Sequence, residues 1–153
     1  MKFVFLNKLF NTPLDLDLDR LKEESKDNPV FYLQYAFARI NSLESKQGEI
    51  KAEGGDKDIK EKEYSYDKKE KELIIQLAHF ENVVQNIIEN QEVHQLAFYA
   101  DLIAKKFHYF YRHFPVLKVE KEKREKRLKI VKATKYVLKN CLKLMAISQP
   151  EKM

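Results

Sequence analysis

Cysteine, glycine and tryptophan are scarce in this chain of 153 residues, which has one cysteine, three glycines and no tryptophan. The single cysteine, Cys141, excludes an internal disulfide framework and is typical of proteins from a reducing compartment. The glycines all lie between residues 48 and 55, so the sequence has no glycine-rich loop of the kind that cradles a nucleotide phosphate. No hydrophobic run approaches the roughly 20 residues of a membrane span. The composition therefore predicts a cytoplasmic protein with no membrane partner.

Catalytic and metal-binding signatures are also missing. None of the four histidines is paired with a cysteine at zinc-finger spacing, and neither G-x-S-x-G nor H-E-x-x-H occurs. The acidic residues are spread along the chain, so no pair stands out for general acid–base catalysis. The sequence therefore predicts no catalytic residue, no metal site and no cofactor in this chain.

Abundant Lys, Glu, Leu and Phe, with so few glycines, favour helices over a turn-rich β fold. Helical spacing of apolar residues predicts helices at the following segments: Asp15–Ser25, Asn28–Ser45, Lys69–Ala78, Phe80–Asn90, Glu92–Phe114 and Glu122–Ala146. Residues 46–67 are almost entirely polar, so we expect a mobile surface loop there. The apolar stripes can be buried together in an antiparallel bundle of about five helices, and we expect an all-α fold.

The helix expected after Asn28 has two distinct faces. Asn28 can cap its first amides, and Pro29 suits its first turn. One face carries the apolar residues of a core-facing stripe: Val30, Leu33, Phe37 and Ile40. A second face, roughly 130° away, carries Tyr32, Tyr35, Ala36 and Arg39. Two tyrosines around a small alanine would suit unstacked bases and leave the guanidinium free for a phosphate. The same spacing also fits a second buried face.

The sequence of this helix, N-P-V-F-Y-L-Q-Y-A-F-A-R-I over residues 28–40, resembles a helix of the arginyl-tRNA synthetases, which are class I enzymes. In that family the helix joins the catalytic core to the anticodon-binding domain. Further family segments match in the same order: residues 14–19 (L-D-L-D-L-D), 107–111 (F-H-Y-F-Y) and 132–139 (K-A-T-K-Y-V-L-K). The ending I-S-Q-P-E-K-M resembles the family's I-S-x-P-E-R-M, and Ala146 stands where the family usually has a glycine. Apart from the polar insert, the resemblance spans nearly the whole chain.

The resemblance implies a helical anticodon-binding domain of the DALR type at residues 28–153, after the end of the catalytic region and a linker at residues 1–27. The HIGH-like and KMSKS-like motifs that handle ATP in the family are absent. We therefore expect the C-terminal part of such an enzyme, with ATP and magnesium used only by the intact ligase. Matched residue by residue, the anticodon-binding side chains would be Tyr32, Tyr35, Arg39, Tyr111 and Met153. Tyr111 also fits a core position beside Phe107 and Phe110.

Basic residues are concentrated near the carboxyl terminus, where residues 118–153 hold twelve Lys or Arg and four Glu. Spacings of three and four residues place five lysines on one strip of the last expected helix: Lys129, Lys132, Lys135, Lys139 and Lys143. Such a strip can follow a phosphate backbone. It can equally be the solvated face opposite the core.

Three functions fit these observations. The first is recognition of the anticodon of arginine tRNAs within an arginine–tRNA ligase, with the tRNA and the catalytic domain of the same enzyme as partners and the chain as a monomer. The second is a freestanding, non-catalytic tRNA-binding protein built from the same domain. The third is a helical protein-interaction module whose aromatic faces dock a partner helix.

Overall fold

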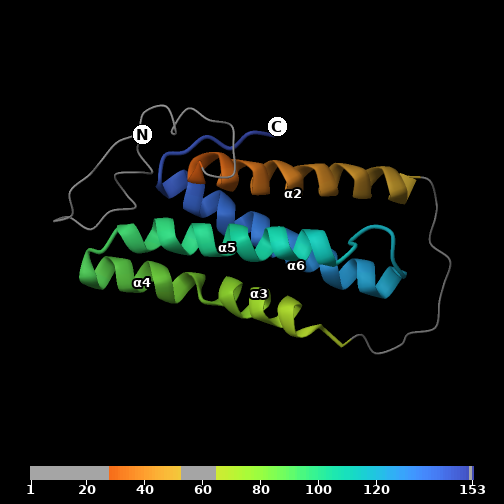
Figure 1. Ribbon diagram of the computed structural model, residues 1–153, viewed down its shortest axis with the longest axis horizontal. Coiled ribbons are helices and arrows are strands. Elements are labelled where there is room, and N and C mark those ends of the chain that lie inside the picture. The colour runs from red at the N-terminus through yellow and green to blue at the C-terminus, as the bar shows by residue number, and fades with distance from the viewer. Residues whose placement is uncertain (1–27, 53–64, 152) are drawn as a thin grey trace.

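Five helices form the part of the chain that the computed structural model describes, namely residues 28–52, 65–151 and 153 (Figure 1). They are α2 (Pro29–Ala52), α3 (Lys68–Ala78), α4 (Phe80–Asn90), α5 (His94–His113) and α6 (Lys121–Leu144). These residues contain no strand, so the predicted all-α fold is confirmed. The helix expected at residues 15–25 lies outside the described residues.

Helix α5 lies at the centre of the bundle and contacts each of the other four helices. In Figure 1, α2 and α5 run in one direction, while α6 and the α3–α4 pair run in the other. The core cluster joins Ile103 and Phe107 of α5 to Leu138 and Leu142 of α6. None of the five helices combines the length and apolarity needed to cross a bilayer.

Cys141 belongs to this core and is fully buried. Burial raises the pKa of its thiol to about 12, because the thiolate would lose its hydration. Cys141 therefore packs as a small buried hydrophobic residue.

Helix α2 begins as its sequence predicts. Asn28 Oδ1 accepts hydrogen bonds from the amides of Val30 at 3.1 Å and Phe31 at 3.4 Å, so it caps the helix directly before Pro29. The expected core stripe is buried at Leu33, Phe37 and Ile40, with Val30 partly buried against it.

The expected end of α2 at Ser45 is wrong, because the helix continues to Ala52. Residues 46–52 are good helix formers apart from Gly48, and polar side chains do not prevent a helix from extending into solvent. The predicted loop therefore starts at least seven residues too early. Residues 53–64, which make up most of the remaining predicted loop, lie outside the described residues.

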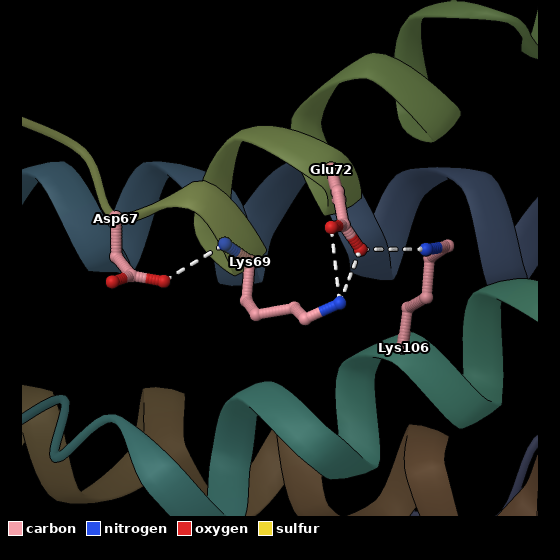
Figure 2. A network of polar contacts seen from close by, with 4 residues as sticks. All are labelled: Asp67, Lys69, Glu72 and Lys106. Atoms are coloured by element: carbon pink, nitrogen blue, oxygen red, sulfur yellow. Dashed lines mark hydrogen bonds and ion pairs between the residues drawn. The ribbon is translucent and has the colours of Figure 1, made fainter.

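Helix α3 is fixed at its first turn and against α5. Asp67 Oδ1 accepts from the Lys69 amide at 2.8 Å, and Glu70 Oε2 accepts from the Asp67 amide at 2.9 Å, which completes a capping box. Figure 2 shows how Glu72 bridges α3 and α5. Its Oε2 lies 2.9 Å from Lys69 Nζ of α3 and 3.3 Å from Lys106 Nζ of α5.

A buried ion pair ties α3 to the connection between α5 and α6. Arg127 Nε of α6 lies 2.7 Å from Glu70 Oε1, with side-chain exposures of 5% and 0%. Arg127 Nη1 also donates to the Pro115 carbonyl at 2.7 Å, and its guanidinium lies 5.1 Å from the centroid of the Phe114 ring. Helix α5 was expected to end at Phe114, and it ends at His113, two residues before Pro115.

Helix α6 ends in a turn that redirects the chain along α2. The Ile147 amide donates to the Leu142 carbonyl at 2.9 Å, and the Ala146 amide donates to the Lys143 carbonyl at 3.0 Å. This is a Schellman arrangement, and Ala146 takes the left-handed position in it with φ 53°. The segment after the turn lies beside the first half of α2 (Figure 1).

Candidate nucleic-acid interface

Helices α2 and α5 bring five side chains together, which we call the aromatic cluster: Tyr32, Tyr35, Arg39, His108 and Tyr111. Arg39 lies between two rings, with its Cζ 4.5 Å from the ring centroids of both Tyr35 and Tyr111. Arg39 Nη2 also donates to Tyr35 Oη. Sequence spacing places Arg39 one turn after Tyr35, and packing of α5 against α2 supplies Tyr111.

His108 connects the two tyrosines of α2. Its ring centroid lies 5.7 Å from that of Tyr35 at an interplanar angle of 23°, and 4.3 Å from that of Tyr32 at 48°. Its Nε2 lies 3.4 Å from the Tyr32 carbonyl oxygen. Sequence reasoning missed His108 as a member of this face, although its position three residues before Tyr111 predicts that the two share one side of α5.

The four predicted members of the cluster are half-buried, so the rings are neither sealed in the core nor fully free. Burial raises the pKa of Tyr32, and the nearby Asp101 carboxylate raises it further. Two expectations for this face change. Ala36 is fully buried and belongs to the core, because α2 also packs against α6. The guanidinium of Arg39 is not free but stacked, and part of its donor capacity is used by Tyr35.

The carboxyl-terminal tail, residues 146–151 with Met153, lies on another side of α2. Gln34 Nε2 donates to the Ser148 carbonyl at 3.2 Å and to Ser148 Oγ at 2.7 Å, and Asn41 Nδ2 donates to the Pro150 carbonyl at 3.4 Å. At about 100° per residue, Gln34 and Asn41 point roughly 140–180° away from Tyr32 and Arg39. Met153 is 52% exposed. The tail and the aromatic cluster therefore flank α2 from opposite sides.

The lysine strip of α6 is interrupted near its centre. Lys129, Lys132, Lys139 and Lys143 are exposed, whereas Lys135 Nζ lies 2.5 Å from Glu44 Oε2 of α2. This ion pair neutralises one of the five predicted positive charges, because α2 and α6 lie side by side. Tyr136, which the sequence analysis did not single out, lies on the same side of α6 as the lysine strip, and its ring is 65% exposed.

Within the described residues, no three His, Cys, Asp or Glu side chains are grouped so that they could hold a metal ion. The features that this part of the chain offers a ligand are partly exposed rings, a stacked guanidinium and exposed lysines. Such groups bind bases and phosphates without making or breaking bonds.

Comparison with known proteins identifies relatives along the whole chain. The profile of the family described as "DALR anticodon binding domain" matches residues 33–153. The arginine–tRNA ligase of Aquifex aeolicus is 36% identical over 155 aligned positions, covering 100% of this chain and 27% of the relative. That of Desulfosudis oleivorans is also 36% identical, covering 99% of this chain and 28% of the relative.

Solved structures agree with these relatives. An arginyl-tRNA synthetase structure from Campylobacter jejuni superposes with a TM-score of 0.82 and 27% identity, covering 99% of this chain and 32% of that chain. The arginyl-tRNA synthetase of Thermus thermophilus has the same fold, with a TM-score of 0.77 and 24% identity. The chain therefore spans little more than a quarter of the length of its curated relatives, and over residues 33–153 it belongs to the DALR anticodon-binding domain family.

Proposed function

We propose that this chain recognises the anticodon of arginine tRNAs as the C-terminal part of an arginine–tRNA ligase. The intact enzyme would use ATP and magnesium to attach arginine to the tRNA, in a catalytic domain that precedes residue 28 and ends within residues 1–27. The family assignment and the relatives named above support this role. The single buried cysteine fits a cytoplasmic setting, and a core assembled within one chain fits a monomer.

The observation that carries the proposal is the position of Arg39 between Tyr35 and Tyr111 at a half-buried surface. In the proposed mechanism, anticodon bases leave their own stack and lie against the exposed parts of these rings. The guanidinium offers its remaining donors to a base edge or a phosphate. Met153 adds an exposed apolar side chain next to the bases.

The exposed lysines of α6 would add attraction that does not depend on sequence. Lys129, Lys132, Lys139 and Lys143 would contact phosphates of the anticodon arm and release bound counterions. Because its charge is already paired with Glu44, Lys135 would contribute less than the other four.

Replacing Tyr35 with alanine tests the proposal, with Tyr109→Ala as a matched control. Tyr109 is an exposed ring of α5 that stacks on His113, outside the aromatic cluster. Loss of one stacked base costs about 1–3 kcal/mol, so Tyr35→Ala should raise the Kd for an arginine tRNA transcript about 5- to 150-fold. Tyr109→Ala should leave the Kd unchanged.

Fluorescence anisotropy with the arginine tRNA transcript and with an anticodon-substituted transcript measures both effects. The preference of the wild-type chain for the natural anticodon should shrink in Tyr35→Ala. If Tyr35→Ala lowers the melting temperature strongly but leaves the Kd of the folded protein unchanged, Tyr35 is a packing residue and the proposed site is wrong. An in-frame HIGH-like motif upstream of Met1 would separate a ligase from a freestanding tRNA-binding protein.

A further inference from the structure

The outer surface of α2 is bounded on both sides. On one side, α5 brings His108 and Tyr111 against Tyr35 and Arg39. On the other side, the tail is attached through Gln34 and Asn41. Between these two boundaries lie Phe31 and Tyr35, whose ring planes are 7° from parallel with centroids 6.2 Å apart. The strip of α2 between the boundaries is the part of the aromatic surface that faces outward.

The tail is fastened more firmly than a chain terminus usually is, since the last residues of most domains are poorly ordered. Two side chains of α2 bind its backbone, and Gln149 Nε2 of the tail donates to the Lys139 carbonyl of α6 at 3.2 Å. The Schellman turn sets its direction, with Ile147 packed against the core. The tail nevertheless ends in Met153, whose apolar side chain is 52% exposed. Fastening a tail that ends in an exposed apolar side chain adds little burial energy to the fold, so the hydrogen bonds at Ser148, Gln149 and Pro150 indicate a task outside the fold.

We propose that Gln34 is a positioning residue that holds the carboxyl-terminal tail as the second wall of the anticodon site. This inference rests on the proposed function. The Gln34 amide is turned away from the face of Tyr32 and Arg39 and binds both the carbonyl and the hydroxyl of Ser148. It would therefore act on RNA through the tail, by keeping this segment, which ends in Met153, attached along α2.

One substitution at Gln34 removes two of the four hydrogen bonds that fasten the tail. The Gln34 and Ser148 groups are solvent-exposed, and the Asn41 bond is long at 3.4 Å. Gln34→Leu removes the amide donor and replaces it with an apolar side chain that is equally compatible with a helix. Gln85→Leu is the matched control, because Gln85 Nε2 makes a comparable exposed bond, to Glu89 within α4.

The state of the tail is measured in the free protein by labelling the methionine methyl groups with ¹³C. Met145 is 2% exposed and serves as an internal probe of the core, whereas Met153 reports on the tail. Gln34→Leu should narrow the Met153 methyl signal towards that of an unfolded chain and leave the Met145 signal unchanged. It should raise the Kd for the arginine tRNA transcript about three- to tenfold, the loss expected for one or two hydrogen bonds.

A truncated chain ending at Ile147 shows whether Gln34 acts through the tail. Truncation should weaken tRNA binding at least as much as Gln34→Leu does, and Gln34→Leu should have no further effect in the truncated chain. If Gln34→Leu weakens binding equally in both backgrounds, Gln34 acts elsewhere and the inference is overturned. It is also overturned if Gln34→Leu frees the tail but leaves the Kd unchanged while Tyr35→Ala still weakens binding, and the proposed function then stands. If Tyr35→Ala has no effect on binding, the proposed function fails and the inference fails with it.

Discussion

The buried pair of Glu70 and Arg127 gives the sharpest stability prediction, and the perturbation is Arg127→Met. Methionine fills much of the same volume but removes the guanidinium that lies 2.7 Å from the fully buried Glu70 carboxylate. The hydrogen bond to the Pro115 carbonyl and the contact with the Phe114 ring are lost as well. Removing one partner of a buried ion pair typically costs about 3–5 kcal/mol, because the remaining charge is neither hydrated nor compensated.

That cost is a large part of the 5–15 kcal/mol that usually stabilises a domain. At about 2–4 °C per kcal/mol for a chain of this size, Arg127→Met should lower the melting temperature by roughly 6–20 °C. Adding Glu70→Gln removes the buried negative charge and keeps an oxygen that can accept from the Asp67 amide. The double variant should therefore be more stable than Arg127→Met alone.

Urea and thermal unfolding followed by far-UV circular dichroism measure both variants. Lys105→Met is the control, since it breaks the pair with Asp101, in which Lys105 is 64% exposed. Exposed pairs contribute little, so its melting temperature should stay close to that of the wild type. The reasoning is refuted if Arg127→Met is as stable as Lys105→Met, or if the double variant is less stable than Arg127→Met.

Three further outcomes are expected. Ala146→Gly should stabilise the chain by about 0.5–1 kcal/mol in urea unfolding, because glycine takes a left-handed φ without strain. Gln91→Gly should have the same effect, because Gln91 also has a left-handed φ, of 59°. A loss of stability in both variants would contradict this account. Cys141 should react with thiol reagents at pH 9 only when the chain unfolds, and labelling much faster than unfolding would contradict this. Burial raises the pKa of its thiol from 9.0 to about 12 in the folded state. The contribution of Cys141 to the free energy of unfolding should therefore be complete below pH 9 and decline above it. Lys132→Gln should weaken tRNA binding and reduce the slope of log Kd against log salt concentration by about one, whereas an unchanged slope would make Lys132 part of a solvated face.

Features that depend on neighbouring residues in the sequence were predictable. The Asn28 cap and the buried stripe of α2 follow from helical spacing, and the end of α5 follows from Pro115. Helix α2 continued beyond Ser45 because helix formation needs only favourable backbone propensities, whereas the prediction of a loop was based on the lack of apolar residues.

Features that depend on packing between helices were not predictable from spacing alone. Whether Arg39 would be free or stacked depends on Tyr111, which lies 72 residues away and reaches it only because α5 packs on α2. The neutralisation of Lys135 likewise depends on Glu44. Ala146 stands where the family usually has a glycine, but only the backbone shows that the residue is left-handed.

The position of Arg39 between two rings has a consequence for the entropy of binding. A free arginine side chain loses roughly 2 kcal/mol of rotational freedom when a ligand fixes it, but Tyr35 and Tyr111 already restrict this one before any ligand arrives. The guanidinium is thus preorganised, and most of its remaining hydrogen-bonding energy is available for affinity. Lysine at this position would keep the charge but lose the planar stacking, so the site would regain the ordering cost that the two rings now remove.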